Sequence, residues 1–302
     1  MYQVFEISMV RILLSVLLMF SVQASAEAIR LIDGSGHRIE LEQPARHVVA
    51  LAPDIVENLY AVGAGERIVG RVSYADYPEQ ARAIPLVGDY LRFNIETILS
   101  LRPDLVLAWF EGNPEAQLRR LESFGLTVVR LSSSRIEQIP HNLRLLGQLT
   151  GREAEAESAA ERFETRLAGL TPAAGSTPTL FYQLWDNPLL TVSDDALIGQ
   201  AIAFCGARNP FGTRPESAPQ VSVEAVIAAA PDLIVSTDEV GDGWRARWLN
   251  WPMLPAVRSG ALYTLDADRI HRATPRFLDG LQALCAAVAD TRPPADLGPL
   301  PQ

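Results

Sequence analysis

The chain has 302 residues, of which 48% are hydrophobic and 21% charged, and its formal net charge at pH 7 is −10. A chain of this length is expected to form two domains, because single hydrophobic cores stop growing near this size. The negative charge, with no cluster of lysines and arginines, argues against nucleic acids and membrane surfaces as partners.

The N-terminal segment has the pattern of a secretory signal peptide. Arg11 precedes an apolar run over residues 12–22, and the small residues Ala-Ser-Ala at 24–26 follow. The run is too short to cross a bilayer core of about 30 Å. We therefore predict a signal peptide over residues 1–26, cleaved before Glu27, and an exported mature protein.

After this segment, the sequence predicts a first series of strands and helices. Residues 29–41 predict a β-hairpin with its turn at 33–36. The strands expected next are 47–53, 68–73, 105–109 and 127–132, and the helices are 54–66, 94–101, 114–124 and 135–149. Strands that alternate with helices in this way indicate a mainly parallel sheet.

A long helix is expected to follow. Residues 151–170 place apolar side chains at helical spacing, with glutamates and arginines on the opposite side. At 1.5 Å per residue, such a helix is about 30 Å long. A second series then predicts strands 179–185, 233–237 and 261–266 and helices 194–205, 222–230 and 274–289.

The expected fold class is therefore α/β, with two lobes of mainly parallel sheet joined by one long helix. The expected divisions are the signal peptide (1–26), an N-terminal lobe (27–150), an interlobe helix (151–170), a C-terminal lobe (175–290) and a disordered, proline-rich tail (291–302).

One phrase occurs twice, once in each lobe. NIETILSLRPDLVLAW at 94–109 and SVEAVIAAAPDLIVS at 222–236 align with a constant offset, which is 224 − 96 = 128 for Glu96 and Glu224. Each copy has a helix-capping residue, a glutamate in the first helical turn and Pro-Asp before the next strand. The repetition indicates two lobes of similar construction. Stabilisation of the helix dipole is the alternative explanation for either glutamate.

Cys205 and Cys285 are the two cysteines of the chain. In an exported protein an even pair predicts a disulfide. The alternative is two buried free thiols.

Aromatic residues follow several of the expected strands. Ligands of open α/β folds bind beyond the carboxyl ends of parallel strands, so aromatic side chains there are candidates for binding a flat ligand. The candidates that follow expected strands are Tyr74, Trp109, Phe110 and Trp185. Tyr90 and Phe93, just before the helix at 94–101, are further candidates, and Trp244 and Trp248 could overhang the same cleft. The alternative for each is packing in the core or at its rim.

Residues 48–78, 94–109, 223–236 and 254–266 together resemble the periplasmic substrate-binding proteins of ABC importers for cobalamin, siderophores and haem. The resemblance covers nearly the whole chain after the signal peptide. The cobalamin-binding members are the most similar, through SYADYP (73–78), LAWFEGN (107–113), DADRIHRATPR (266–276) and the placement of both cysteines.

This resemblance implies a Rossmann-like fold in each lobe, a rigid helix between the lobes and a corrinoid ligand, such as cobalamin, held in the cleft. Tyr74, Tyr90 and Trp109 match family positions that line the corrin ring. Asp268 and Arg272 match positions that touch the polar fringe of the ligand.

The resemblance further implies a monomer that delivers its ligand to a transmembrane permease dimer in the inner membrane. Glu96 and Glu224 match the glutamates that dock against permease arginines. A two-fold symmetric partner presents the same surface twice, which suits one carboxylate in each similar lobe. It implies neither a catalytic cofactor nor a metal ligand from the protein.

Other ligands of the same family require different side chains. A negatively charged ferric siderophore would favour arginines in the cleft, for which the candidates are Arg92, Arg245, Arg247 and Arg272. Haem would favour an axial tyrosine or histidine, for which the candidates are Tyr74, Tyr90 and His271. The four histidines have no spacing typical of a zinc site.

A secreted two-domain enzyme is the alternative from another class. GAGERIVG at 63–70 begins like a dinucleotide-binding fingerprint, but Ile68 stands at the third glycine position and the glycines follow a helix. The sequence contains no Walker motif, nucleophile elbow or HExxH helix. We therefore expect a binding protein and not an enzyme.

Overall fold

The computed structural model describes residues 28–171 and 176–291. The expected signal peptide lies outside these ranges, as do residues 292–302 of the expected tail. Thr291, which the sequence assigned to the tail, is the last residue of a helix.

The first lobe contains the expected strands and helices and one strand that the sequence analysis missed. Its elements are β1 (Ile29–Ile32), β2 (Arg38–Leu41), β3 (Val48–Ala50), α2 (Pro53–Ala61), the 3-10 helix η1 (Gly65–Arg67), β4 (Ile68–Val72), the 3-10 helix η2 (Glu79–Ala83), β5 (Leu86–Gly88), α3 (Ile95–Ser100), β6 (Leu105–Trp109), α4 (Glu115–Ser123), β7 (Val128–Leu131) and α5 (Gln138–Thr150). The predicted hairpin is confirmed, because β1 and β2 pair antiparallel. The missed strand, β5, has three residues, too few for a periodic pattern.

The main sheet of this lobe has the order β5-β4-β3-β6-β7, and every pairing in it is parallel. All residues of β3 and β7 are buried, as are Leu105–Ala108 of β6, which explains why these strands are apolar apart from Arg130 in β7. The chain order runs outward from β3 in one direction and from β6 in the other. The topological switch point therefore lies between β3 and β6. This class of fold binds ligands there, beyond the carboxyl ends of the strands.

The second lobe is built in the same way around a smaller sheet. Helix α6 (Glu153–Gly169) precedes this lobe. The elements of the lobe are β8 (Leu180–Tyr182), α7 (Leu197–Phe204), α8 (Val223–Ala229), β9 (Leu233–Thr237), the 3-10 helix η3 (Asp238–Val240), α9 (Trp244–Leu249), α10 (Pro255–Ser259), β10 (Leu262–Leu265), α11 (Ala267–Ile270) and α12 (Phe277–Thr291). The sheet order is β10-β9-β8, with parallel pairing throughout. The expected α/β fold with two mainly parallel sheets is confirmed.

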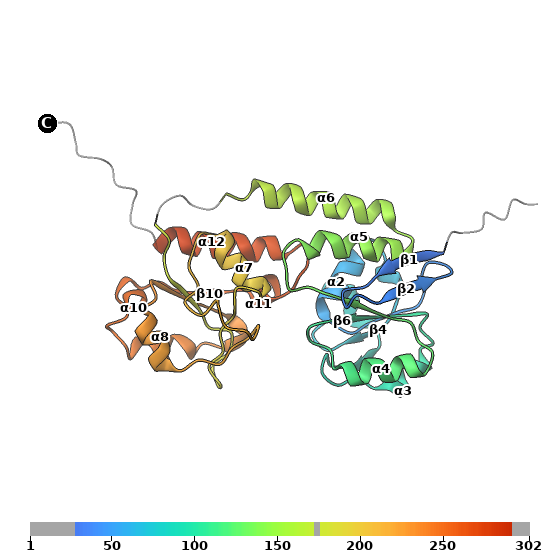
Figure 1. The fold of residues 1–302 in the computed structure, drawn as a ribbon, viewed down its shortest axis with the longest axis horizontal. Coiled ribbons are helices and arrows are strands. Elements are labelled where there is room, and N and C mark those ends of the chain that lie inside the picture. The colour runs from blue at the N-terminus through green and yellow to red at the C-terminus, as the bar shows by residue number, and fades with distance from the viewer. Residues whose placement is uncertain (1–27, 172–175, 292–302) are drawn as a thin grey trace, which may run out of the picture.

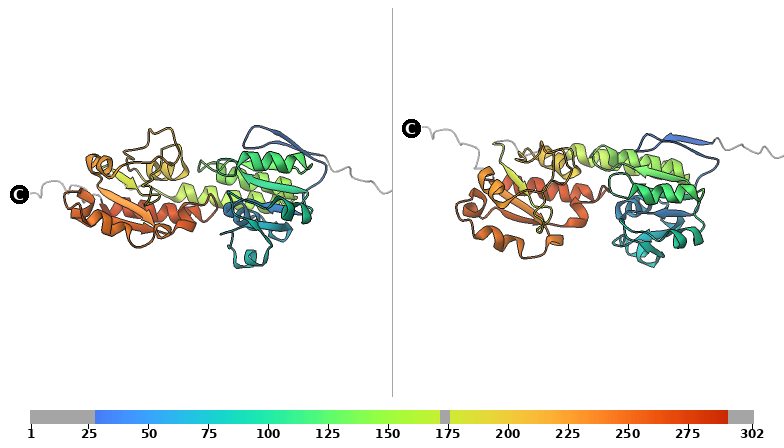
Figure 2. Two further views of the ribbon diagram at one scale, coloured as in Figure 1. Left: turned by 90° about the horizontal axis from the view of Figure 1, so that it is seen from below. Right: turned by 60° about the horizontal axis from the view of Figure 1, so that its bottom comes forward.

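Helix α6 joins the two lobes. It lies along one side of the molecule with α5 and α12 (Figure 1). In both further views the two lobes lie side by side along the long axis of the molecule (Figure 2). Ala156 and Ala160 of α6 pack in the hydrophobic core of the first lobe, whereas Phe163 packs in a core of the second. Because one rigid rod contributes to both cores, it limits how the lobes move relative to each other. The residue limits proposed for the lobes stay a prediction.

The repeated phrase has the same structural role in each lobe. Its cap residues accept hydrogen bonds as expected, Asn94 from the Thr97 N–H at 3.0 Å and Ser222 from the Ala225 N–H at 3.2 Å. The aspartate of each Pro-Asp accepts backbone N–H groups at the entry to the neighbouring strand. Asp104 does so from residues 46 and 47 before β3, and Asp232 from residue 179 before β8. The repeated Pro-Asp therefore has a structural explanation, because each aspartate fixes the start of a neighbouring strand.

The predicted disulfide between Cys205 and Cys285 is confirmed. It joins the end of α7 to α12 in the second lobe. In the described part of the chain, no helix combines the length and the hydropathy that a membrane span requires.

Candidate functional site

The carboxyl edge of the first sheet carries the predicted aromatic side chains. Tyr74 follows β4 and is 74% exposed, Tyr90 follows β5, and Trp109 ends β6 with its side chain partly buried. The Tyr90 and Trp109 rings lie with their centroids 6.2 Å apart and their planes at 53°. Phe110, beside Trp109, is also exposed. The structure thus places four of the predicted aromatic residues at the edge where a ligand is expected.

Asn113 holds the Tyr90–Trp109 pair in place, a role that the sequence analysis missed. Its buried side-chain amide donates to the carbonyl oxygens of Tyr90 at 2.7 Å and Leu51 at 3.0 Å, and its oxygen accepts the Trp109 N–H at 2.7 Å. A Cβ atom at Gly112 would lie 2.0 Å from the Trp109 ring. Both residues belong to the LAWFEGN motif, so the motif positions the tryptophan.

Residues of the second lobe meet this edge through Arg272. The Arg272 guanidinium donates to the Tyr74 carbonyl oxygen at 3.1 Å and pairs with Asp268 at 2.5 Å. The structure therefore brings together three of the predicted binding residues, one from the first lobe and two from the second.

Glu57 of α2, which the sequence analysis also missed, joins the two lobes through three hydrogen bonds. Its carboxylate is 2% exposed and accepts hydrogen bonds from Arg272 at 2.7 Å and from Arg276 at 2.7 and 2.9 Å. The neighbouring Asn58 amide donates to the Ala273 carbonyl oxygen at 2.9 Å. The available signal was a charged and a polar residue inside an otherwise apolar helical segment. We call Glu57, Asp76, Asp268, Arg272 and Arg276 the interlobe ion cluster.

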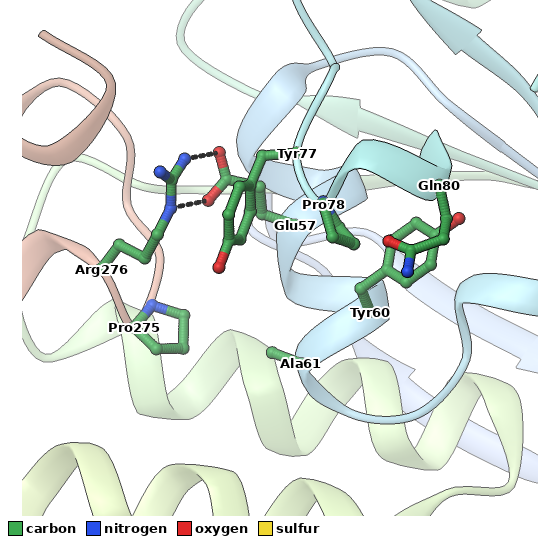
Figure 3. A pocket seen from close by; sticks show the side chains of 8 residues that line it. All are labelled: Glu57, Tyr60, Ala61, Tyr77, Pro78, Gln80, Pro275 and Arg276. Atoms are coloured by element: carbon green, nitrogen blue, oxygen red, sulfur yellow. Dashed lines mark hydrogen bonds and ion pairs between the residues drawn. The ribbon is translucent and has the colours of Figure 1, made fainter. Parts of the chain in front are cut away.

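A pocket of about 520 Å³ lies beside this cluster and is lined by both lobes. The Arg276 guanidinium lies over the Tyr77 ring at 3.7 Å from its centroid. Figure 3 shows this stack beside the bonds from Arg276 to Glu57, with Tyr60 and Gln80 farther along the first lobe. The lining residues are Glu57, Tyr60, Ala61, Tyr77, Pro78, Gln80, Pro275 and Arg276.

Other predicted residues lie elsewhere. Trp185 follows β8 in the second lobe and is 44% exposed. Phe93 is 6% exposed and packs in the core of the first lobe. The suggestion that Trp244 and Trp248 overhang a cleft is wrong, since both are buried in a core and Trp248 donates its indole N–H to the Gln183 side chain.

Of the expected haem ligands, His271 is engaged on both ring nitrogens. Nε2 lies 2.9 Å from the Tyr182 hydroxyl and Nδ1 lies 3.3 Å from the Glu239 carboxylate. Within residues 28–171 and 176–291, no group of three or more acidic, histidine or cysteine side chains is arranged to hold a metal ion.

Asp54, at the start of α2, adds a further carboxyl group near the cluster. Burial, with a contribution from neighbouring Glu57, raises the pKa of Asp54 from 3.8 to about 6, although Ile55 N–H and Arg272 oppose the rise. Its carboxylate is therefore costly in the folded protein at neutral pH.

We expect Asp54→Asn to stabilise the protein at about pH 8 but not at about pH 3.5. Because folding raises the pKa, the favourable contribution of the protonated wild-type group is lost as pH rises from 3.8 to about 6. The full shift in pKa corresponds to an increase of up to about 3 kcal/mol in the free energy of unfolding of the variant at high pH. Urea unfolding at both pH values measures it, and an equal effect at both would contradict the assignment.

The predicted docking glutamates lie on one side of the molecule. Glu96 and Glu224 are exposed in the first turns of α3 and α8, which lie opposite α6 (Figure 1). Hydrogen bonds from the backbone N–H of Glu224 and from the Ser222 hydroxyl lower the pKa of the Glu224 carboxyl group. Among the residues described, neither glutamate forms an ion pair.

The profile of the periplasmic binding protein family matches residues 48–269. A vitamin B12-binding protein of Vibrio parahaemolyticus serotype O3:K6 is 33% identical over 247 residues, which cover 80% of this chain and 89% of the relative. The crystal structure of periplasmic vitamin B12 binding protein BtuF of Vibrio cholerae has a TM-score of 0.76 and 32% identity, covering 82% of this chain and 98% of that one. Periplasmic heme-binding protein RhuT from Roseiflexus sp. RS-1 has a TM-score of 0.73 and 25% identity, covering 82% and 99%.

Proposed function

Because the chain belongs to the periplasmic binding protein family, we propose that it binds cobalamin or a related corrinoid between its lobes and delivers it to an ABC importer permease. The family consists of binding proteins, so the proposed cycle is capture, docking and release with no bond made or broken. Release requires the permease to favour a conformation with lower affinity for the ligand.

The corrinoid assignment depends on one observation: aromatic side chains line the carboxyl edge of the first sheet, and charged side chains of the second lobe lie next to them. A corrin ring is large, flat and surrounded by amides. Tyr74, Tyr90 and Trp109 supply aromatic surface at the carboxyl edge of one sheet. Asp268 and Arg272 supply polar groups from the other lobe. The similarity to vitamin B12-binding relatives supports the same assignment.

Haem is the second candidate, and the exposed Tyr74 hydroxyl is the observation that favours it. His271 is a poor axial ligand in this conformation, because both of its ring nitrogens have partners. Titration of the purified protein with cyanocobalamin, haemin and a ferric siderophore tests the proposal. Tight binding of haemin without binding of cyanocobalamin would replace corrinoid by haem.

We expect Trp109→Ala to weaken cyanocobalamin binding by about 1–3 kcal/mol, because a buried aromatic contact is lost. The dissociation constant, measured by calorimetry, should rise by about 5- to 150-fold. Phe124→Ala is the matched control, since this exposed aromatic residue follows α4 and precedes β7 at the opposite edge of the sheet. An unchanged affinity for Trp109→Ala would remove Trp109 from the site.

The proposal includes the periplasm as the location, with residues 1–26 as the cleaved signal peptide, and a monomeric protein. It also assigns Glu96 and Glu224 to permease docking. Their exposure in the equivalent turns of two similar helices supports this role. Phe93 is left to core packing, and Trp185 is the proposed aromatic contact from the second lobe.

A further inference from the structure

The two arginines between the lobes are already paired with carboxylates. Arg272 contacts Glu57 at 2.7 Å, Asp268 at 2.5 Å and Asp76 at 3.9 Å. Arg276 donates two hydrogen bonds to Glu57 and covers the Tyr77 ring. Both guanidinium groups are therefore largely neutralised before any ligand enters.

Carboxylates outnumber arginines around this point. Asp54 lies close enough to Glu57 and Arg272 to interact with both, so four carboxyl groups surround two arginines. Arg82 pairs with Asp76 at 3.6 Å but is itself mostly exposed. On the other side, Glu239 and His271 pair with each other. The local charge is negative even when Arg82 is included.

The pKa values of two of these carboxyl groups rise, in agreement with this charge. For Asp54 the causes are burial and then Glu57. Burial raises the pKa of Asp268, and Asp76 adds to the rise against the opposing effect of Arg272.

The remaining arginines proposed from the sequence lie outside the interlobe ion cluster and differ in their partners. Arg247 pairs with Asp186 at 2.9 Å, and the Arg245 guanidinium lies 5.4 Å from the centroid of the Trp244 ring. Arg92 is exposed, and within the described chain its side chain has no hydrogen-bond or ion-pair partner. Of the four candidates, Arg247 and Arg272 therefore have carboxylate partners, whereas Arg92 and Arg245 have none among the described residues.

We propose that Glu57 is a specificity determinant, which occupies Arg272 and Arg276 and so makes the interlobe site reject anionic chelates and accept neutral or cationic corrinoids. This inference rests on the proposed function and names the charge class of its ligand. An anion would have to displace a carboxylate that is 2% exposed and held by three hydrogen bonds. It would also lie beside the other carboxylates, and like charges in contact disfavour binding.

The test compares four probes by equilibrium titration at low and high salt. They are cyanocobalamin, cationic diaquocobinamide, haemin with its propionates, and an anionic ferric tris-catecholate. For the wild-type protein we expect both corrinoids to bind at least about 100-fold more tightly than the tris-catecholate, a gap of about 2.8 kcal/mol. Added salt should weaken diaquocobinamide binding and leave cyanocobalamin binding nearly unchanged.

Glu57→Gln is the diagnostic variant, because it keeps the shape of the side chain and removes the carboxylate charge that Arg272 and Arg276 share. Its affinity for the tris-catecholate should rise at least about tenfold relative to wild type, whereas cyanocobalamin should change less. Glu164→Gln is the matched control, since Glu164 also pairs with an arginine, Arg144, but lies on α6. This control should change neither affinity.

Circular dichroism first establishes that Glu57→Gln is folded. If it is not, Asp268→Asn serves instead, because this half-exposed carboxylate also pairs with Arg272. Corrinoid binding with no gain in anion affinity for the folded variant would overturn the inference and leave the proposed function intact. Failure of the wild-type protein to bind any corrinoid would overturn both.

Discussion

Reversing both docking glutamates, Glu96→Lys with Glu224→Lys, is expected to abolish corrinoid uptake and leave corrinoid affinity unchanged. Both side chains are exposed in first helical turns and lie away from the interlobe ion cluster. If the permease presents arginines there, each substitution replaces an attraction by a repulsion that costs several kcal/mol. Two such repulsions leave no favourable docking geometry on a two-fold symmetric partner.

The measurement is uptake of labelled cyanocobalamin into proteoliposomes that contain the cognate permease, with affinity measured separately by calorimetry. Glu153→Lys with Glu161→Lys is the matched control. It changes the net charge by the same amount on α6, on the opposite side of the molecule (Figure 1). Normal uptake by the Glu96/Glu224 variant would refute the docking role, and loss of uptake by the control would point to net charge.

Much of the fold could be predicted because its strands are buried on both faces. The segments that became β3, β6, β7 and β9 are short, mostly apolar runs separated by helical patterns, and this alternation is typical of a parallel sheet. The aromatic residues of the site were predictable for the same reason. Once the predicted strands are placed, the fold itself puts Tyr74 and Trp109 at one edge, whereas Tyr90 follows β5, the strand that the sequence analysis missed.

The residues that join the lobes could not be predicted. Glu57 and Arg272 are separated by 215 positions, and neither has a local pattern that names its partner. Asn113 looks like a loop residue, although its hydrogen bonds reach Tyr90 and Leu51. Trp248 was misplaced because an aromatic residue on a short helix has the same local signature at a ligand site and in a core.

The largest expected effect on stability concerns Arg130 of β7. Its side chain is 2% exposed and is held by Glu115 at 3.1 Å and Glu122 at 2.7 Å. Burial lowers the pKa of Arg130, but the hydrogen bonds that its guanidinium donates to Glu122 and Glu115 outweigh this effect, so the pKa rises above its ordinary value. The guanidinium is therefore charged in the folded wild-type protein.

Removing both carboxylates, Glu115→Ala with Glu122→Ala, should lower the free energy of unfolding by about 3–5 kcal/mol, because a charged arginine is left buried without a partner. Adding Arg130→Leu should recover part of this loss, since the two carboxylates are partly exposed and the charge that needs them is the arginine. Urea unfolding of the wild-type protein, the double variant and the triple variant measures both effects.

Arg144 provides the control for this experiment. It is also held by two glutamates, Glu157 at 2.7 Å and Glu164 at 2.6 Å, but its side chain is 33% exposed. Glu157→Ala with Glu164→Ala should therefore cost only about 1 kcal/mol, because water can replace the lost partners. Equal losses for the two pairs would show that burial of the arginine does not set the cost. A triple variant with Arg130→Leu that is less stable than the double variant would show that the arginine contributes by packing instead of by charge.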